Sequence, residues 1–350
     1  MTLKSLRAAP MALAVFLCLS PTARADDPDA FRAALAAADA RDWPAAVEKA
    51  RASGPLAAAV IDWARLRDGK AGFYEYADFL SRHPDWPGLP LLRKKGEATI
   101  AEDVPAQKVI AYFASEKPQT GTGSLAYVAA LRAQGQSGAA EAEAVRAWRS
   151  LSMTEGEHEL FVALYGPWLA DHHDGRTATM LRDGNVADVK RMLPLNSAYT
   201  RAVAEARVAL QTDAAGVDDL IAALPARAVN SGGLAYDRFR WRIRKDLYDS
   251  ADDLLLERST SAEALGDPEQ WADWRRRLAR KEMREGDPRR AYRMAAEHHL
   301  KRGPDYADLE WLAGYIALRK LGDATTALVH FDRFLKAVNG PISVSRAQYW

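Results

Sequence analysis

The stretch Leu309-Glu310-Trp311-Leu312-Ala313-Gly314-Tyr315-Ile316-Ala317-Leu318 decides the fold class. Its apolar residues recur three or four positions apart, which is the spacing of one face of an α-helix. Gly322 then interrupts the pattern, and a second helical pattern follows in which Ala327 precedes Phe331 and Phe334. Two apolar-faced segments separated by a glycine predict a pair of short helices that reverse direction.

The same turn recurs elsewhere in the chain. The offset from glycine to alanine is identical in three places: Gly135 to Ala140, Gly286 to Ala291 and Gly322 to Ala327. This spacing resembles the second half of a tetratricopeptide unit, in which a small residue lets two helices approach and an aromatic ring fills the gap. The last two of these turns lie about one such unit (~34 residues) apart. The pattern predicts degenerate helix pairs, each packed on its neighbour.

The rest of the chain carries similar signals. Ile61, Trp63 and Leu66 lie at helical spacing before a break at Asp68-Gly69, and the mature sequence is rich in Ala, Leu and Arg. Such a composition favours helix over strand, and no stretch alternates with a period of two. We therefore expect an all-α fold, arranged as an α-α superhelix of tetratricopeptide-like helix pairs.

Composition narrows the class of protein. The chain has 350 residues, of which 48% are hydrophobic and 27% charged, as in ordinary folded proteins. Its formal net charge is +1. Proteins that bind nucleic acids usually carry a strong basic excess, so we expect no nucleic-acid partner.

The N-terminus has the order of a secretory signal. Lys4 and Arg7 precede an apolar run from Met11 to Leu19, and Ala23-Arg24-Ala25 supplies small residues around a cleavage point after Ala25. The run is shorter than the ~20 residues needed to span a bilayer. We expect a signal peptide over residues 1–25, a superhelical helical-repeat domain over 26–350, and a periplasmic protein without membrane insertion.

The chain's one cysteine lies inside that apolar run. Leu17 precedes Cys18, whereas a lipoprotein signal needs a small residue there, so simple cleavage is the favoured interpretation. The mature chain then has no cysteine for a disulfide or a thiol nucleophile.

Several stretches resemble a known family when they are taken together and in order. They are Asp62-Trp63-Ala64-Arg65-Leu66-Arg67, Phe79-Leu80-Ser81-Arg82-His83-Pro84-Asp85-Trp86-Pro87, Pro118-Gln119-Thr120-Gly121-Thr122-Gly123, Phe239-Arg240-Trp241-Arg242, the 309–318 stretch, His330-Phe331 and Ser345-Arg346-Ala347-Gln348-Tyr349-Trp350. From about Phe31 to Trp350 the chain is similar to the N-terminal superhelical (U-shaped) domain of soluble lytic murein transglycosylases.

The resemblance implies a partner and an activity. Members of that family cleave the β-1,4 bond between N-acetylmuramic acid and N-acetylglucosamine in peptidoglycan, through a following lysozyme-like domain with one catalytic Glu. That Glu is usually followed by Ser, with Gly-Leu-Met-Gln nearby, and neither pattern occurs here. We therefore expect a scaffold, truncated at its C-terminus, that contacts glycan strands and its own missing catalytic domain. The alternative is an exported helical-repeat adaptor that binds a protein or peptide.

No residue is assigned to a catalytic, cofactor or metal site, although two carboxylates are candidates for a role in glycoside cleavage. Glu310 lies beside Trp311, and Asp273 lies between Trp271 and Trp274, so each could be a sugar-stacking acid. We favour the interpretation that the tryptophans pack between helices and the carboxylates face water.

Three further motifs have plain structural interpretations. Asp171-His172-His173-Asp174 predicts a polar loop, and neither it nor His298-His299 has the spacing of a metal site. The arginine run, made of Arg275, Arg276, Arg277, Arg280 and Arg284, could bind an anionic glycan, but nearby acids favour a solvated face with i,i+4 ion pairs. Gly121-Thr122-Gly123 predicts a helix start, and Gly232-Gly233 a break between helices.

The C-terminal segment is apolar on one side. Ile342, Val344, Tyr349 and Trp350 predict an exposed apolar face if the array ends there. Fraying or self-association would follow, because a helical array normally needs a capped end.

Overall fold

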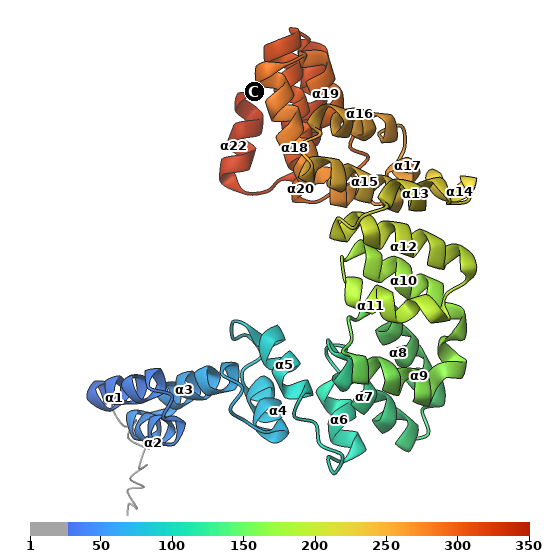
Figure 1. The fold of residues 1–350 in the computed structure, drawn as a ribbon. Helices are drawn as coiled ribbons and strands as arrows, with labels where there is room; N and C mark the ends of the chain where they lie inside the picture. Colours follow the sequence, from blue (N-terminus) through green and yellow to red (C-terminus); the bar gives the residue numbers. More distant parts are fainter. Residues whose placement is uncertain (1–26) are drawn as a thin grey trace, which may run out of the picture. The chain divides into compact units, whose positions relative to one another are not determined.

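The computed structural model describes residues 27–350, and all regular structure in that part of the chain is helical (Figure 1). This confirms the all-α prediction, whereas the superhelical course of the array stays a prediction. The predicted signal peptide, residues 1–25, lies outside the described residues. None of the helices within 27–350 is long and apolar enough to cross a membrane.

Contacts between α-carbons separate the chain into two compact units, residues 27–119 and 120–350. The first unit, here unit 1, contains six helices in its described part: α1 (Pro28–Asp39), α2 (Trp43–Ser53), α3 (Pro55–Arg67), α4 (Phe73–Arg82), α5 (Leu89–Glu97) and α6 (Ala106–Tyr112). A proline lies in the first turn of α1, α2, α3 and α5, where its missing N–H costs nothing. Ala34, Ala46 and Ile61 form the apolar contact of α1, α2 and α3.

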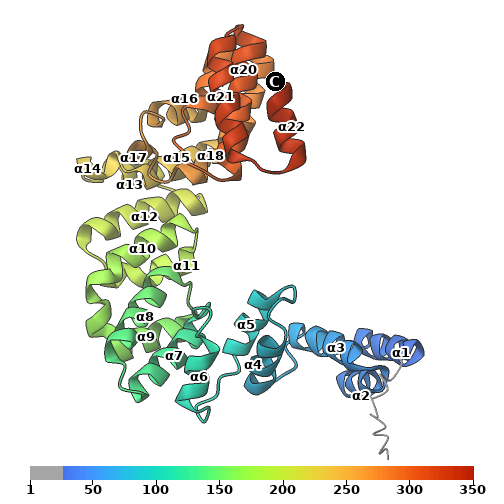
Figure 2. The same cartoon turned by 180° about the vertical axis from the view of Figure 1, so that it is seen from behind.

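Residues 120–350 form unit 2. Its helices are α7 (Gly121–Ala133), α8 (Ser137–Ser150), α9 (Glu155–Leu169), α10 (His173–Arg182), α11 (Val186–Met192), α12 (Ala198–Thr212), α13 (Val217–Ala222), α14 (Ala226–Val229), α15 (Gly232–Arg244), α16 (Tyr248–Arg258), α17 (Ala262–Leu265), α18 (Pro268–Glu285), α19 (Pro288–Ala296), α20 (Pro304–Ile316), α21 (Ala324–Ala337) and α22 (Pro341–Tyr349). Within unit 2 most helices pack against the next in sequence, and α20 and α21 lie side by side (Figure 2).

The repeated glycine turns lie where the sequence predicts them. Gly135 and Gly322 have φ of +71° and +68°, the left-handed region that glycine adopts without strain. Gly286 differs, because its φ is −127° and it ends α18 without entering that region. Each turn leads to a fully buried alanine on the following helix, Ala140, Ala291 and Ala327.

The helix pair α20 and α21 packs through a glycine. A Cβ placed on Gly314 would lie 2.9 Å from Cε1 of Phe331, closer than real Cβ contacts come. Phe331 is 4% exposed, so its ring fills the space that the missing side chain leaves. The close approach predicted for this pair is thus made by Gly314 as well as by the small Ala327.

Arginine side chains connect helices in unit 2. The Arg176 guanidinium donates to the carbonyls of Trp148 and Leu151 at the end of α8. Arg244 and Arg258 reach the ends of α12 and α17 in the same way, at Leu210 O and Ala264 O. The last carbonyls of a helix have no N–H partner in the regular helix pattern, and these arginine bridges supply donors to them; Leu210 O also accepts the Asp213 N–H at 3.4 Å.

Candidate functional site

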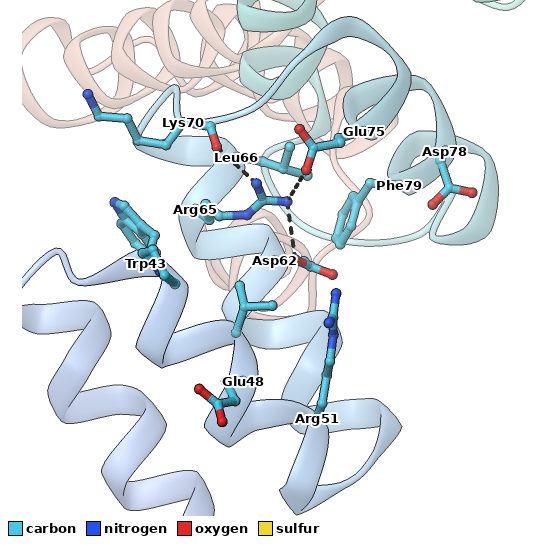
Figure 3. A pocket seen from close by; sticks show the side chains of 12 residues that line it. Trp43, Glu48, Arg51, Asp62, Arg65, Leu66, Lys70, Glu75, Asp78 and Phe79 are labelled. Carbon is cyan, nitrogen blue, oxygen red and sulfur yellow. Dashed lines mark hydrogen bonds and ion pairs between the residues drawn. The ribbon is translucent and has the colours of Figure 1, made fainter.

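A pocket of about 560 Å³ lies in unit 1 between α2, α3 and α4 (Figure 3). Its wall combines apolar and charged side chains: Trp43, Pro44, Val47, Leu66 and Phe79, with Glu48, Asp62, Glu75, Asp78, Arg51, Arg65 and Lys70. Pockets that bind small polar molecules combine an apolar wall with a few fixed polar groups. The pocket therefore has the composition of a binding site.

Arg65 fixes the polar groups on one side of this pocket. Its guanidinium donates to Lys70 O at 3.0 Å and to Oε1 of Glu75 at 2.6 Å, as the dashed lines in Figure 3 show. Asp62 lies farther away, with Oδ1 3.4 Å from Nη2. Because only 18% of the Arg65 side chain is exposed, these contacts hold both carboxylates in place before any ligand arrives.

Glu75 is held from a second direction. It lies in the first turn of α4, where its Oε2 accepts the Gly72 N–H at 2.9 Å. Burial acts to raise the pKa of Glu75, but the hydrogen bonds from Gly72 and Arg65 outweigh it and place the pKa below its ordinary value. This carboxylate stays ionised at neutral pH, so it can accept hydrogen bonds from a ligand but cannot supply a proton.

The opposite wall comes from α2. The half-buried Trp43 begins this helix, and its indole N–H donates to Oδ2 of Asp68 at 3.1 Å. Arg51 extends from the same helix toward Asp62 (Figure 3). Arg65 is ion-paired, but among residues 27–350 neither Arg51 nor Lys70 forms an ion pair, so these two cations remain open to a ligand.

Glu310 does not face water, and that expectation is wrong. The residue is 3% exposed and lies on α20 between two histidines. Its Oε1 is 3.3 Å from Nε2 of His298, and its Oε2 is 2.6 Å from Nδ1 of His330. The sequence around Glu310 could not reveal this burial, because the two histidines come from the segment before α20 and from α21.

The hydrogen bonds around Glu310 assign the histidine tautomers. Leu300 N–H donates to Nδ1 of His298 at 2.9 Å, so the neutral ring carries its proton on Nε2 and donates it to Glu310. Tyr292 Oη lies 3.0 Å from Nε2 of His330, which leaves the Nδ1 proton for Glu310. Both carboxylate oxygens are thereby satisfied.

The electrostatics of Glu310 argue against an acid catalyst. Burial acts to raise its pKa, but the hydrogen bonds from His298 and His330 outweigh burial and lower the pKa to about 2. A glycosidase acid needs a raised pKa in a cleft that admits the sugar. Glu310 is instead a buried carboxylate that ties α20 to its neighbours.

Asp273 and its flanking tryptophan behave as the packing interpretation predicts. Trp271 is fully buried, with its ring 4.9 Å from that of Phe239. The Asp273 side chain is 53% exposed and pairs with Arg277 at 2.8 Å. This carboxylate faces water on α18, as expected.

The arginine run divides between core and surface. Arg275 was expected on a solvated face, but it is 1% exposed and donates to Met294 O at 2.8 Å and Oγ of Ser259 at 2.7 Å. Burial lowers the pKa of its guanidinium to about 10. Arg277 makes the predicted i,i+4 pair with Asp273. Spacing alone could not separate the two, because both lie in one charged run.

The polar loop predicted around the histidine pair is a helix. Ala170–His172 forms a 3₁₀ turn that runs directly into α10 at His173. The Asp174 carboxylate anchors this helix by accepting the Ser197 N–H at 3.1 Å and its hydroxyl at 2.8 Å. Tertiary contacts therefore override the local loop preference of this segment.

Both glycine motifs lie at helix starts. Gly121 begins α7, where Thr120 accepts the Gly123 N–H at 2.9 Å, as predicted. At the second motif the break precedes the glycines, because α15 begins at Gly232. A Cβ there would lie 2.4 Å from the backbone of Gly266, so only glycine fits.

Comparisons with known proteins add no match that bears on the roles of these residues. No known protein family matches the chain, and no curated protein is significantly similar to it. Within residues 27–350 no group of three or more His, Cys, Asp or Glu side chains is placed to hold a metal ion.

Proposed function

We propose that this chain is the scaffold region of a periplasmic lytic transglycosylase, and that the unit 1 pocket binds the glycan strand of peptidoglycan. The pocket between α2, α3 and α4 is the observation that carries the binding proposal. The ordered motifs that resemble soluble lytic murein transglycosylases support the choice of polymer. Cleavage of the β-1,4 bond belongs, in this proposal, to a separate lysozyme-like domain.

The chemistry of the pocket suits such a strand. Acetamido sugars present hydroxyl and amide groups, which ionised carboxylates and guanidinium groups can bind. Glu75 and Asp62 supply fixed acceptors beside Arg65. The Trp43 ring offers an apolar surface for a sugar face.

The unpaired cations add selectivity for a charged polymer. N-acetylmuramic acid carries a lactyl carboxylate, and the stem peptides attached to a strand carry further carboxylates. Arg51 and Lys70 line the pocket without an ion pair, so a ligand carboxylate has cations to meet. A neutral polysaccharide such as chitin lacks these groups and should bind more weakly.

Co-sedimentation with purified sacculi tests the proposal. The double variant Arg51→Gln/Lys70→Gln removes both free cations without disturbing a hydrogen bond of the fold. We expect its affinity for sacculi to fall by about fivefold or more, equivalent to about 1 kcal/mol. The control Lys49→Gln/Lys94→Gln makes the same charge change at exposed residues of unit 1 outside the pocket and should sediment like the unmodified chain.

Two results would overturn the proposal. If the unmodified chain stays in the supernatant, glycan binding is excluded and the alternative, an adaptor that binds a protein or peptide, is favoured. Equal loss in both double variants would reduce the interaction to general charge attraction. The chain should also release no muropeptides by itself, so measurable release would contradict the assignment of cleavage to another domain.

A further inference from the structure

A second pocket, in unit 2, has a different character. It encloses about 390 Å³ between the start of α20 and one face of α21, and Lys301, Arg302, Arg333 and Lys336 line it with Gly303 and Tyr306. No carboxylate lines this basic pocket. Such a concentration of one charge in one cavity needs an explanation, because like charges repel.

We propose that the basic pocket binds a small oxyanion ligand with at least two negative charges, carried by a phosphoryl group or by paired carboxylates. This site is separate from the unit 1 pocket and does not depend on the function proposed for it. Three features of the pocket lead to this ligand class.

The first feature is uncompensated charge. Lys301, Arg302 and Lys336 are exposed, and none of them forms an ion pair with any of residues 27–350. A bound oxyanion relieves the repulsion among these cations and accepts hydrogen bonds from each of them. One negative charge would leave most of the excess in place, which favours a multiply charged ligand.

The second feature is the way that Arg333 is held. Its Nη1 lies 3.6 Å from Oε1 of Glu310, while half of its side chain, 51%, remains exposed. Glu310 is itself fixed by His298 and His330. The buried carboxylate therefore lies beside one end of the guanidinium, while half of the Arg333 side chain stays exposed at the pocket, and a guanidinium can bind an oxyanion through two parallel N–H groups.

The third feature is the start of α20. Gly303 is the N-cap residue and offers no side chain to the free N–H groups of the first turn, and Pro304 follows it. Asp305, which could shield them, turns away to pair with Arg276 at 2.7 Å. The positive end of a helix of 13 residues thus adds to the four cations around the same cavity.

One competitor for the cations is close by. Lys301 and Arg302 also line a neighbouring pocket of about 300 Å³, whose wall includes Asp267 and Glu269. No ion pair joins these acids to the two cations. Glu269→Gln should therefore raise the affinity for an anion slightly, because it removes a negative charge from the pocket that Lys301 and Arg302 also line.

Calorimetric titration of the full chain tests the proposal. The probes are inorganic pyrophosphate, citrate and glucose at neutral pH and about 0.15 M salt, where general charge attraction is screened. We expect at least one anion to bind with a dissociation constant below about 1 mM, and glucose not to bind. Preference for pyrophosphate indicates a phosphoryl ligand, and preference for citrate indicates paired carboxylates.

Matched variants locate the site. Arg302→Gln/Lys336→Gln should weaken the bound anion by about tenfold or more. Arg319→Gln/Lys320→Gln removes the same charge from exposed positions outside the pocket and should change affinity by less than about twofold. Absence of binding by both anions, or equal loss in the two double variants, overturns the proposal.

Discussion

Replacing Gly314 by alanine perturbs a tight contact between α20 and α21. The added Cβ would lie 2.9 Å, 3.0 Å and 3.1 Å from three ring atoms of Phe331, whereas ordinary contacts begin at 3.4 Å. Phe331 is 4% exposed and packs against Ala317 and Ala327, so its ring has no open space to enter. Either the ring or the helix must move by several tenths of an ångström.

Two opposing effects set the magnitude. Alanine in a helix interior is favoured over glycine by about 0.5–1 kcal/mol. Overpacking a well-filled core costs about 1–3 kcal/mol. The overlap at Gly314 is with a buried ring and not with a flexible side-chain end, so overpacking wins. We expect Gly314→Ala to destabilise the chain by about 0.5–2 kcal/mol.

Urea unfolding followed by circular dichroism measures the change in the free energy of unfolding, and hydrogen exchange of the amides in α20 and α21 locates it. Gly175→Ala is the matched control, because the new Cβ would lie 3.5 Å from Nε of Arg149, an ordinary contact, and it should stabilise by about 0.5–1 kcal/mol. Adding Phe331→Leu should relieve the penalty at Gly314. If Gly314→Ala stabilises the chain as much as Gly175→Ala does, the packing argument is wrong.

Four further substitutions test other contacts. Arg275→Ala removes a buried guanidinium that donates to two acceptors, so it should lower the free energy of unfolding by about 3 kcal/mol or more. Arg277→Ala changes a side chain that is 62% exposed and should lower it by less than about 0.5 kcal/mol. Denaturant unfolding of both variants measures the difference. Burial raises the pKa of Asp252 from 3.8 to about 6, because the folded chain favours the protonated carboxyl group. The stability that this preference contributes is fully present below pH 3.8 and is lost as the pH rises through about 6. Asp252→Asn should therefore gain stability relative to the unmodified chain by about 1–3 kcal/mol between about pH 4 and pH 8, and a pH-independent difference would disprove the assignment. Burial acts to raise the pKa of Glu157, but hydrogen bonds from two N–H groups and two hydroxyls hold it below 4.5, so Glu157→Gln should cost about 1 kcal/mol at neutral pH, and less as the pH falls below 4.5, in thermal unfolding.

Local sequence predicts the helices of this chain well, because their ends carry local signals. Glycines in the left-handed region and capping residues such as Thr120 act within a few positions, so Gly135, Gly322 and Gly121 lie where the pattern places them. The histidine pair at His172 shows the limit of such signals. There the contact between Asp174 and Ser197 determines the outcome, and local composition does not contain it.

The polar side chains are harder to predict, because their surroundings come from distant segments. Glu310 looks like a surface acid on an amphipathic helix until His330 and Tyr292 are placed beside it. Arg275 and Arg277 are two positions apart on one helix, yet one is buried and the other exposed. The unit 1 pocket was missed for the same reason, since it brings together Trp43 and Glu75 from separate helices.

The buried Arg275 bears on the response of unit 2 to mechanical load. Arg275 on α18 joins Ser259 at the end of α16 to Met294 near the end of α19. Pulling α16 away would strand a buried guanidinium, and pulling α19 away would strand a buried carbonyl as well. Under tension, the smallest segment that can detach without leaving a buried polar group unpaired is therefore larger than one helix pair. A single-molecule stretching trace of unit 2 should show few, long extensions in place of a regular staircase of hairpins.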